Sequence, residues 1–253
     1  MKTPHVMVNI GNTRTSVALG DGSRIWRVGY VPTHSQTMRT IRQALRVASG
    51  GGRVEGAILC SVVPEVTEGW RKVLRDAAGS RPLVVTHRLE IGLAVDYPRP
   101  ETLGADRLAN VCAAASQYAT PLIVADFGTA ATFDVVTKDR RYVGGVIAAG
   151  PGVMCDYLGE RTARLPAIRF QASRIRIGKN TREAMRIGAY VGYGGLVRGI
   201  VEHLMDAPGL RKANLVATGG FAGVVATGTG LAFRVCPVLT LQGLSRIWAM
   251  NRR

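Results

Sequence analysis

The sequence lacks any apolar run that approaches the roughly 18–20 residues of a membrane-spanning helix. Before Pro4 and His5 it has one lysine and no apolar stretch of signal length, so we expect no secretory signal. Together these two absences predict a soluble, cytoplasmic protein that has no membrane partner. The 253 residues are 47% hydrophobic, which is enough for the cores of two compact domains.

Cysteine is scarce, and its spacing excludes two common kinds of site. Cys60, Cys112, Cys155 and Cys236 lie far apart, with no CxxC pair and no Cys/His pair at zinc spacing. Each has apolar or small neighbours in the sequence. We therefore predict buried free thiols, with neither a zinc site nor a redox pair.

Acidic residues are few, at 17 against 33 Lys+Arg, and the net charge is +16. Such a balance invites a nucleic-acid hypothesis. However, the cations are spread along the chain, and the densest patch, Arg161–Arg186, holds only eight of them against Glu183. Attraction to anionic small molecules explains the charge more simply. Nucleic acid therefore remains an alternative that we do not expect to be the main partner.

A weak internal repeat relates the two halves of the chain. The segment "VNIGNTRTSVAL" at 8–19 aligns with "ADFGTAATFDVV" at 125–136, at an offset of 117 residues. Each copy follows an apolar strand and precedes a strand, a polar turn and a further strand, which predicts an antiparallel meander. The alignment pairs Gly11 with Gly128, Thr15 with Thr132 and Asn9 with Asp126.

After each meander the apolar periodicity becomes helical, and buried parallel strands follow. The predicted helices are 35–49, 65–77, 107–119, 181–207 and one starting at Phe221; the predicted later strands are 54–64, 81–87, 214–220 and 231–237. This pattern predicts two α/β domains, 1–118 and 119–253, each with a mixed five-stranded sheet. A ligand is expected in the cleft between them.

The two glycine-containing turns have a chemical and a structural interpretation. Glycine lets the backbone approach a ligand closely, and neighbouring hydroxyl, amide and N–H groups can donate to phosphate oxygens. Two ordinary hairpins with polar loops are the alternative. Because the turns occupy corresponding positions of a duplication, we favour a pair of phosphate-binding turns.

At this point the chain resembles the type III pantothenate kinases, within the acetate kinase–sugar kinase–Hsp70–actin superfamily. The residues that carry the resemblance run almost end to end: "GNTRT" at 11–15, "SVVP" at 61–64, "LGADRLAN" at 103–110, "DFGTAATFD" at 126–134, "ERTARLP" at 160–166, "IGKNT" at 177–181, "TGG" at 218–220 and "LTLQGL" at 239–244. The resemblance implies two duplicated ribonuclease H-like domains. It also implies ATP-dependent phosphorylation of the 4′-hydroxyl of pantothenate, the first step of coenzyme A biosynthesis.

The same resemblance implies roles for individual residues. Asp106 would be the general base, Asp126 would bind potassium or ammonium, ATP would be used with Mg²⁺, and the protein would be a homodimer. The implied ATP-binding residues are Asn9, Ile10, Gly11, Asn12, Thr13, Arg14, Thr15, Ser16 and Thr129. The implied pantothenate-binding residues are Tyr97, Gly104, Ala105, Asp106, Arg107 and Thr181.

Three of these residues also have purely structural interpretations. Asp106, before an alanine-rich helix, could simply favour the helix N-terminus. Thr181 follows Asn180, which with Glu183 makes a capping box that needs no substrate. Tyr97 could be a surface aromatic. Chemistry at Asp106 instead requires a carboxylate within hydrogen-bond reach of a hydroxyl proton.

Four glycines lie on one face of the predicted helix 181–207, namely Gly188, Gly192, Gly195 and Gly199. Glycine costs about 1 kcal/mol relative to alanine inside a helix, so a stripe of it implies a close approach by another backbone. We predict a helix–helix dimer contact. Tight packing on the protein's own sheet is the alternative.

Two positions depart from the family pattern. Asn9 stands where related kinases carry an aspartate that helps to hold Mg²⁺, and Gln242 stands where glutamate is expected. Asparagine offers one carbonyl oxygen and no charge. A catalytically weak or inactive paralogue, acting as a binding or regulatory protein, is therefore the alternative function.

Overall fold

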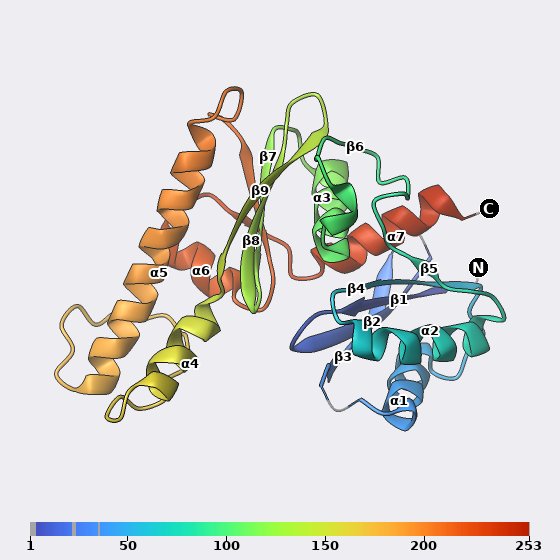
Figure 1. The fold of residues 1–253 in the computed structure, drawn as a ribbon, viewed down its shortest axis with the longest axis horizontal. Coiled ribbons are helices and arrows are strands. Elements are labelled where there is room, and N and C mark those ends of the chain that lie inside the picture. Colours follow the sequence, from blue (N-terminus) through green and yellow to red (C-terminus); the bar gives the residue numbers. More distant parts are fainter. Residues whose placement is uncertain (1–3, 22–23, 35, 253) are drawn as a thin grey trace. The chain divides into compact units, whose positions relative to one another are not determined.

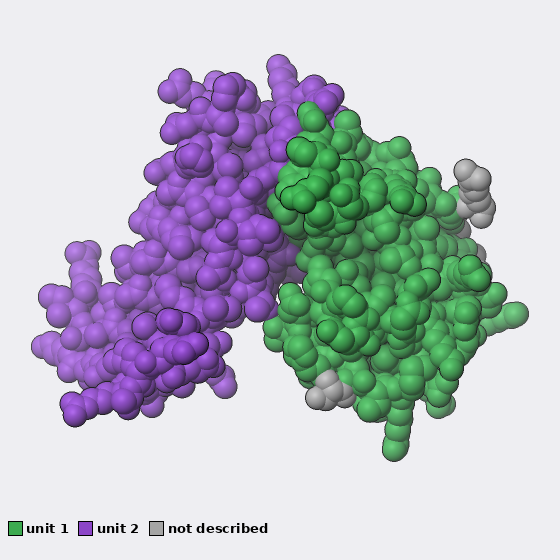
Figure 2. Space-filling view, viewed as in Figure 1, with its two compact units in different colours: residues 1–117, 238–253 green, residues 118–237 purple. Residues whose placement is uncertain are grey.

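The computed structural model describes residues 4–21, 24–34 and 36–252. They form two compact units: unit 1 is Met1–Gln117 with Val238–Arg253, and unit 2 is Tyr118–Pro237 (Figure 2). Ser35, the expected start of the first helix, and residues 22–23 of the first polar turn lie outside the described residues. Within the described residues no helix is long and apolar enough to cross a membrane.

Unit 1 contains a mixed five-stranded sheet in the order β3-β2-β1-β4-β5. The hairpin β1–β2–β3 is antiparallel, whereas β4 and β5 run parallel to β1. Its elements (Figure 1) are β1 (His5–Ile10), β2 (Arg14–Gly20), β3 (Ile25–Pro32), α1 (Met38–Ser49), β4 (Gly56–Ser61), α2 (Pro64–Ala78), β5 (Leu83–Val84), β6 (Ala94–Val95), the 3₁₀ helix η1 (Pro100–Thr102), α3 (Ala105–Gln117) and α7 (Leu239–Asn251).

Unit 2 repeats this plan in its first five strands. The second sheet has the order β11-β10-β7-β8-β9-β6, so it contains six strands and not the five that we expected, the sixth being the two-residue strand β6. Here β7, β8 and β9 form the antiparallel meander, and β10 and β11 are the parallel strands. The matching orders confirm the duplication. Its elements are β7 (Leu122–Phe127), β8 (Ala130–Val136), β9 (Arg141–Ala149), α4 (Pro151–Arg161), α5 (Thr181–Met205), β10 (Asn214–Thr218), α6 (Ala222–Thr229) and β11 (Arg234–Val235).

Alternating side chains of β1 build separate cores on the two faces of the unit 1 sheet. Val6, Val8 and Ile10 pack with residues of α1 and α2 on one face, while Met7 packs with residues of α3 and α7 on the other. The sheet is therefore covered on both sides. Its β1–β2 turn remains at the edge where the parallel strands end.

Helix α7 corrects the expected domain boundaries, because it belongs to unit 1 and not to a second domain that extends to residue 253. The reason is a backbone contact: a Cβ atom added at Gly243 of α7 would overlap the carbonyl oxygen of Ala109 in α3. Leu241, Leu244 and Ile247 continue this contact into the core of unit 1. The sequence pattern of a helix does not indicate which unit it packs against, so periodicity alone could not assign α7 to unit 1.

Burial is confirmed for three of the four cysteines. Cys60, Cys112 and Cys155 are buried, and Cys236 is partly exposed. The expected strands 81–87 and 231–237 shorten to the two-residue strands β5 and β11. Apolar composition predicted these segments, but only two residues of each form ladder pairs with a neighbouring strand.

His5 is a buried histidine with no hydrogen-bond partner on either ring nitrogen among the described residues. Its ring stacks on Trp248 of α7 at 5.2 Å. Burial, followed by repulsion from Arg252, lowers the pKa of His5 to about 4, although Asp21 opposes the shift. Between pH 6.5 and about 4, His5 therefore binds a proton in the unfolded chain but not in the folded chain.

We accordingly expect the free energy of unfolding to fall as the pH drops from 7 to 4.5, by roughly 2–3 kcal/mol through this residue. His5→Phe should flatten this part of the pH dependence, because phenylalanine keeps the stacking and does not titrate. Urea denaturation of both proteins at the two pH values measures the difference. Equal slopes would show that His5 is not the titrating group.

Candidate active site

The β1–β2 turn is braced by hydrogen bonds from its own backbone and from Thr33. The amide of Gly11 donates to the carbonyl of Arg14 at 3.1 Å, and the hydroxyl of Thr33 donates to the carbonyl of Gly11 at 2.6 Å. The amide of Thr33 donates to the carbonyl of Thr13 at 3.0 Å. The turn is therefore pre-shaped, as a phosphate-binding loop needs to be.

The polar residues of this segment divide between the core and the surface. Thr15 is buried, with its hydroxyl 3.0 Å from that of Thr33, and Ser16 is also buried. Asn12, Thr13 and Arg14 are exposed. The guanidinium of Arg14 lies 4.2 Å from the ring centroid of Tyr30. The side chains of Asn12, Thr13 and Arg14 can therefore reach a ligand, while the buried Thr15 stabilises the turn through Thr33.

Asn9 lies near the end of β1, paired with Ser16 of β2 and Cys60 of β4. The thiol of Cys60 donates to Oδ1 of Asn9 at 3.1 Å, so the amide oxygen already has a donor. Within the described residues no group of three or more His, Cys, Asp or Glu is placed to hold a metal ion.

Beside the second turn, between β7 and β8, the position equivalent to Asn9 is occupied by the carboxylate of Asp126. Asp126 pairs with Thr132 of β8 and Thr218 of β10, just as Asn9 pairs with Ser16 and Cys60. The sheet register thus confirms the match of Asn9 with Asp126. It corrects the match of Thr15 with Thr132, because Thr132 corresponds to Ser16.

The reason for this correction is that the first turn is one residue longer. Residues 11–13 connect β1 to β2, whereas only 128–129 connect β7 to β8. An alignment without gaps slips by one after the turn.

Close backbone packing surrounds Asp126 and Thr129. A Cβ atom at Gly219, whose φ is +93°, would lie 2.5 Å from Oδ1 of Asp126, so only glycine fits beside this carboxylate. Gly150 donates its amide to the carbonyl of Thr129 at 3.0 Å, and any side chain at this glycine would overlap the turn. Thr129 itself is exposed.

Asp106 and Arg107 lie in the first turn of α3, which begins at Ala105, slightly earlier than expected. Oδ1 of Asp106 accepts the backbone N–H of Arg107 at 2.8 Å and lies against Gly104, where a Cβ would come within 2.6 Å. Burial raises the pKa of Asp106, and the N–H and charge of Arg107 oppose this shift. A carboxylate with a raised pKa is a better proton acceptor.

Thr181 is the first residue of α5, and the cap is its neighbour Asn180. Oδ1 of Asn180 accepts the amide of Glu183 at 3.0 Å, as expected for a capping box. The reciprocal bond differs, since Glu183 accepts from Lys179 at 2.9 Å and not from Asn180. Capping therefore leaves the exposed hydroxyl of Thr181 at the helix N-terminus. Tyr97 is half-buried, so it is not a fully exposed surface aromatic.

The glycine stripe of α5 does not pack on the protein's own sheet. A Cβ atom added at Gly188, Gly192 or Gly199 would meet nothing within 4 Å. The internal contact is made by another glycine, Gly194, whose added Cβ would lie 2.8 Å from the carbonyl oxygen of Gly228 in α6. On the outer face Val191 is 58% exposed, and Leu196 is 40% exposed.

Sequence reasoning missed two contacts around the unusual neutral residues. Cys60 was expected only as a buried thiol, yet it donates to Asn9. Gln242 of α7 accepts from Nε2 of Gln117 in α3 at 3.0 Å. Parallel alignment of the strands 5–10 and 56–61 could have suggested the first contact. Nothing in the local pattern indicated the second.

The comparisons with known proteins agree with this duplicated architecture. The sequence model of type III pantothenate kinase matches residues 5–203. The chain belongs to the type III pantothenate kinase family. Its activity is therefore that of a pantothenate kinase, a transferase that phosphorylates pantothenate with ATP.

Individual relatives support the same assignment over nearly the whole chain. A type III pantothenate kinase of Akkermansia muciniphila is 41% identical, over 98% of this chain and 99% of its own. One from Acidiphilium cryptum is 38% identical, over 97% and 94%. The ROK hexokinase of Thermus thermophilus has a TM-score of 0.51 at 16% identity, covering 96% of this chain and 97% of its own. This last likeness shows the sugar-kinase fold.

Proposed function

We propose that Asp106 is the general base of this pantothenate kinase and that the β1–β2 turn binds the ATP phosphates. The observation that carries the proposal is the raised pKa of Asp106. The carboxylate takes the proton of the pantothenate hydroxyl while the new O–P bond forms to the γ-phosphorus. The bond from this phosphorus to the leaving ADP oxygen breaks in the same displacement.

In this proposal the exposed groups of the turn bind phosphate, and further residues position pantothenate. Gly11, Asn12, Thr13 and Arg14 supply N–H, amide, hydroxyl and guanidinium donors. Thr129, in the corresponding turn of unit 2, is a further proposed ATP-binding residue. Pantothenate carries a carboxylate, which Arg107 can bind as a charged pair. Tyr97 and the backbone of Gly104 and Ala105 complete the proposed substrate site within unit 1. Thr181 of unit 2 is a further proposed pantothenate-binding residue.

A coupled assay for ADP release tests the proposal directly. Phosphorylation of pantothenate should depend on ATP and Mg²⁺ and should rise with potassium or ammonium. The alternative is a binding protein without turnover, which the neutral, already engaged amide of Asn9 favours. Binding of pantothenate and ATP by calorimetry, with no ADP release at any metal concentration, would select that alternative.

We expect Asp126→Ala to remove the response to potassium. Asp126 is a partly buried carboxylate beside a proposed phosphate-binding turn, where phosphate would repel it unless a cation lies between them. The measurement is initial rate against potassium concentration in both proteins. Asp139→Ala, at an exposed carboxylate of the same unit, is the matched control. Unchanged potassium dependence in Asp126→Ala would refute the cation role.

We propose that two copies associate through the outer face of α5, and we expect Gly192→Leu to yield a folded monomer. A Cβ atom at this position meets nothing within one copy, so we expect the substitution to disturb only a close helix–helix contact. Overpacking such a contact costs about 1–3 kcal/mol. Sedimentation measures the state of association.

Gly223→Leu is the matched control for this substitution. It places the same side chain at an exposed glycine of α6 whose Cβ also meets nothing. This variant should remain dimeric. A wild-type monomer, or a Gly192→Leu dimer of unchanged affinity, would contradict the proposed contact.

A further inference from the structure

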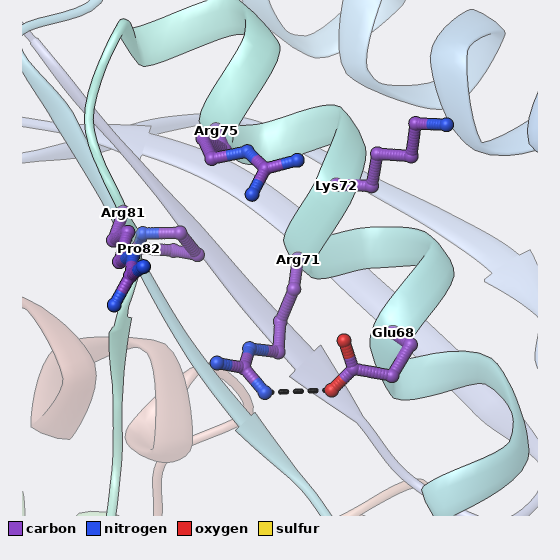
Figure 3. A pocket seen from close by; sticks show the side chains of 6 residues that line it. All are labelled: Glu68, Arg71, Lys72, Arg75, Arg81 and Pro82. Atoms are coloured by element: carbon purple, nitrogen blue, oxygen red, sulfur yellow. Dashed lines mark hydrogen bonds and ion pairs between the residues drawn. The ribbon is translucent and has the colours of Figure 1, made fainter.

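A basic pocket lies beside α2, apart from every residue assigned to the kinase site. It is lined by Glu68, Arg71, Lys72, Arg75, Arg81 and Pro82, and its volume is about 270 Å³ (Figure 3). Four of these side chains are cationic and one is anionic. All belong to unit 1.

The positive charge of the pocket is only partly neutralised. Nη1 of Arg71 binds Oε1 of Glu68 at 2.6 Å. For Lys72, Arg75 and Arg81 the described part of the chain offers no ion-pair partner. The pocket therefore keeps an excess of positive charge, with four cationic side chains against one carboxylate.

This arrangement is unfavourable for the empty protein. Arg71 and Arg75 are four residues apart on one helix, and like charges at this spacing destabilise a helix. Arg81 adds a third guanidinium from the segment before β5. The other carboxylates of α2, Glu65 and Asp76, do not line the pocket. An anion bound among the arginines would relieve this repulsion.

The view in Figure 3 indicates which groups can act together. Arg71 and Arg81 extend their guanidinium groups toward the same space beside α2, whereas Lys72 points away from Arg81. Arg75 lies one turn further along the helix. Guanidinium forks match phosphate oxygens two at a time, and several together favour a ligand with more than one phosphate.

We propose that this pocket binds the diphosphate group of a small phosphorylated molecule. Its volume lies slightly below the range of about 300–1,000 Å³ that is usual for ligand pockets. A diphosphate fits such a space, while the rest of a larger ligand would extend into solvent. The excess of cationic side chains in the pocket is complementary to the negative charge of this group.

The site is distinct from the proposed nucleotide-binding turn. Arg81 and Pro82 immediately precede β5, at the edge where the parallel strands of unit 1 begin. The β1–β2 turn follows the end of β1, at the opposite edge of the same sheet. Failure of the kinase proposal would leave this one unaffected, because the two use no common residue.

Calorimetric titration of the full chain with sodium pyrophosphate tests the proposal. We expect one pyrophosphate site to weaken at least tenfold in the double variant Arg75→Gln/Arg81→Gln. All substituted side chains are exposed, so folding should be unchanged. Arg42→Gln, which removes an exposed cation of α1, is the matched control and should bind as the wild type does. Pyrophosphate bound at the nucleotide-binding turn would persist in all three proteins.

Three results would overturn the proposal. The first is equal pyrophosphate affinity in the wild type and the double variant. The second is an equal loss in Arg42→Gln, which would reduce the effect to overall charge. The third is an oligothymidylate that binds more tightly than pyrophosphate and loses affinity in the double variant, which would make the pocket part of a nucleic-acid surface. Inorganic phosphate, as a further probe, should bind more weakly than pyrophosphate.

Discussion

Asp106→Asn is expected to lower the turnover number by about 10²–10⁴-fold, the usual loss when a positioned base is removed. Asparagine keeps the shape and can still accept the backbone N–H of Arg107, so folding and ATP binding should change little. The coupled assay gives the rate, and calorimetry gives the ATP affinity. Glu101→Gln, an exposed carboxylate in η1, is the matched control and should retain full activity.

The pH profile adds a second readout for Asp106. Because its pKa is raised by burial, the base becomes protonated, and turnover falls, at a higher pH than for an ordinary aspartate. This acidic limb should disappear from the residual activity of Asp106→Asn. A variant with a near wild-type rate and the same acidic limb would remove Asp106 from the mechanism.

Asn9→Asp is expected to raise activity with Mg-ATP by about ten- to a hundredfold, mainly through a lower KM. A charge-assisted interaction contributes about 1.5–3 kcal/mol, and the carboxylate would supply it to the hydrated metal at the phosphates. Cys60 can still donate its thiol to the new oxygen, so the local geometry should persist. Arg14 lies over Tyr30, which limits its competition for the new charge.

A magnesium titration of the wild type and Asn9→Asp measures this effect. Asn12→Asp is the matched control, since it adds the same charge on the exposed part of the turn, away from the paired position in β1. It should not reproduce the gain. Unchanged magnesium dependence and ATP affinity in Asn9→Asp would show that Asn9 is not an altered metal-site residue.

Much of the architecture could be predicted from local patterns. Alternating apolar residues predicted the two meanders, and helical periodicity predicted the helix 35–49. The structure shows this helix as α1, with Ile41 and Leu45 buried. The predicted helix 181–207 matches α5, which ends at Met205. These features follow from contacts between near neighbours in the chain, which composition and spacing express directly.

The candidate site was less predictable, because its geometry depends on register and on residues far apart in the sequence. The shorter second turn moves Thr132 opposite Asp126, which an alignment without gaps misplaces. The bond from Cys60 to Asn9 spans 51 residues. Sequence spacing could name Asn9 as unusual, but it could not show that its oxygen already has a donor.

By itself the sequence determined the duplication, the family, the glycine turns and the neutral residue at position 9, since each is written in residue types and their spacing. Only the tertiary structure decided that α7 joins unit 1, that the glycine stripe of α5 faces outward, and that Arg81 gathers with the arginines of α2. These outcomes depend on which backbones come close enough to exclude a side chain and on which surfaces stay uncovered. Packing between segments that are distant in the sequence determines both the close backbone contacts and the uncovered surfaces, so local periodicity cannot predict them.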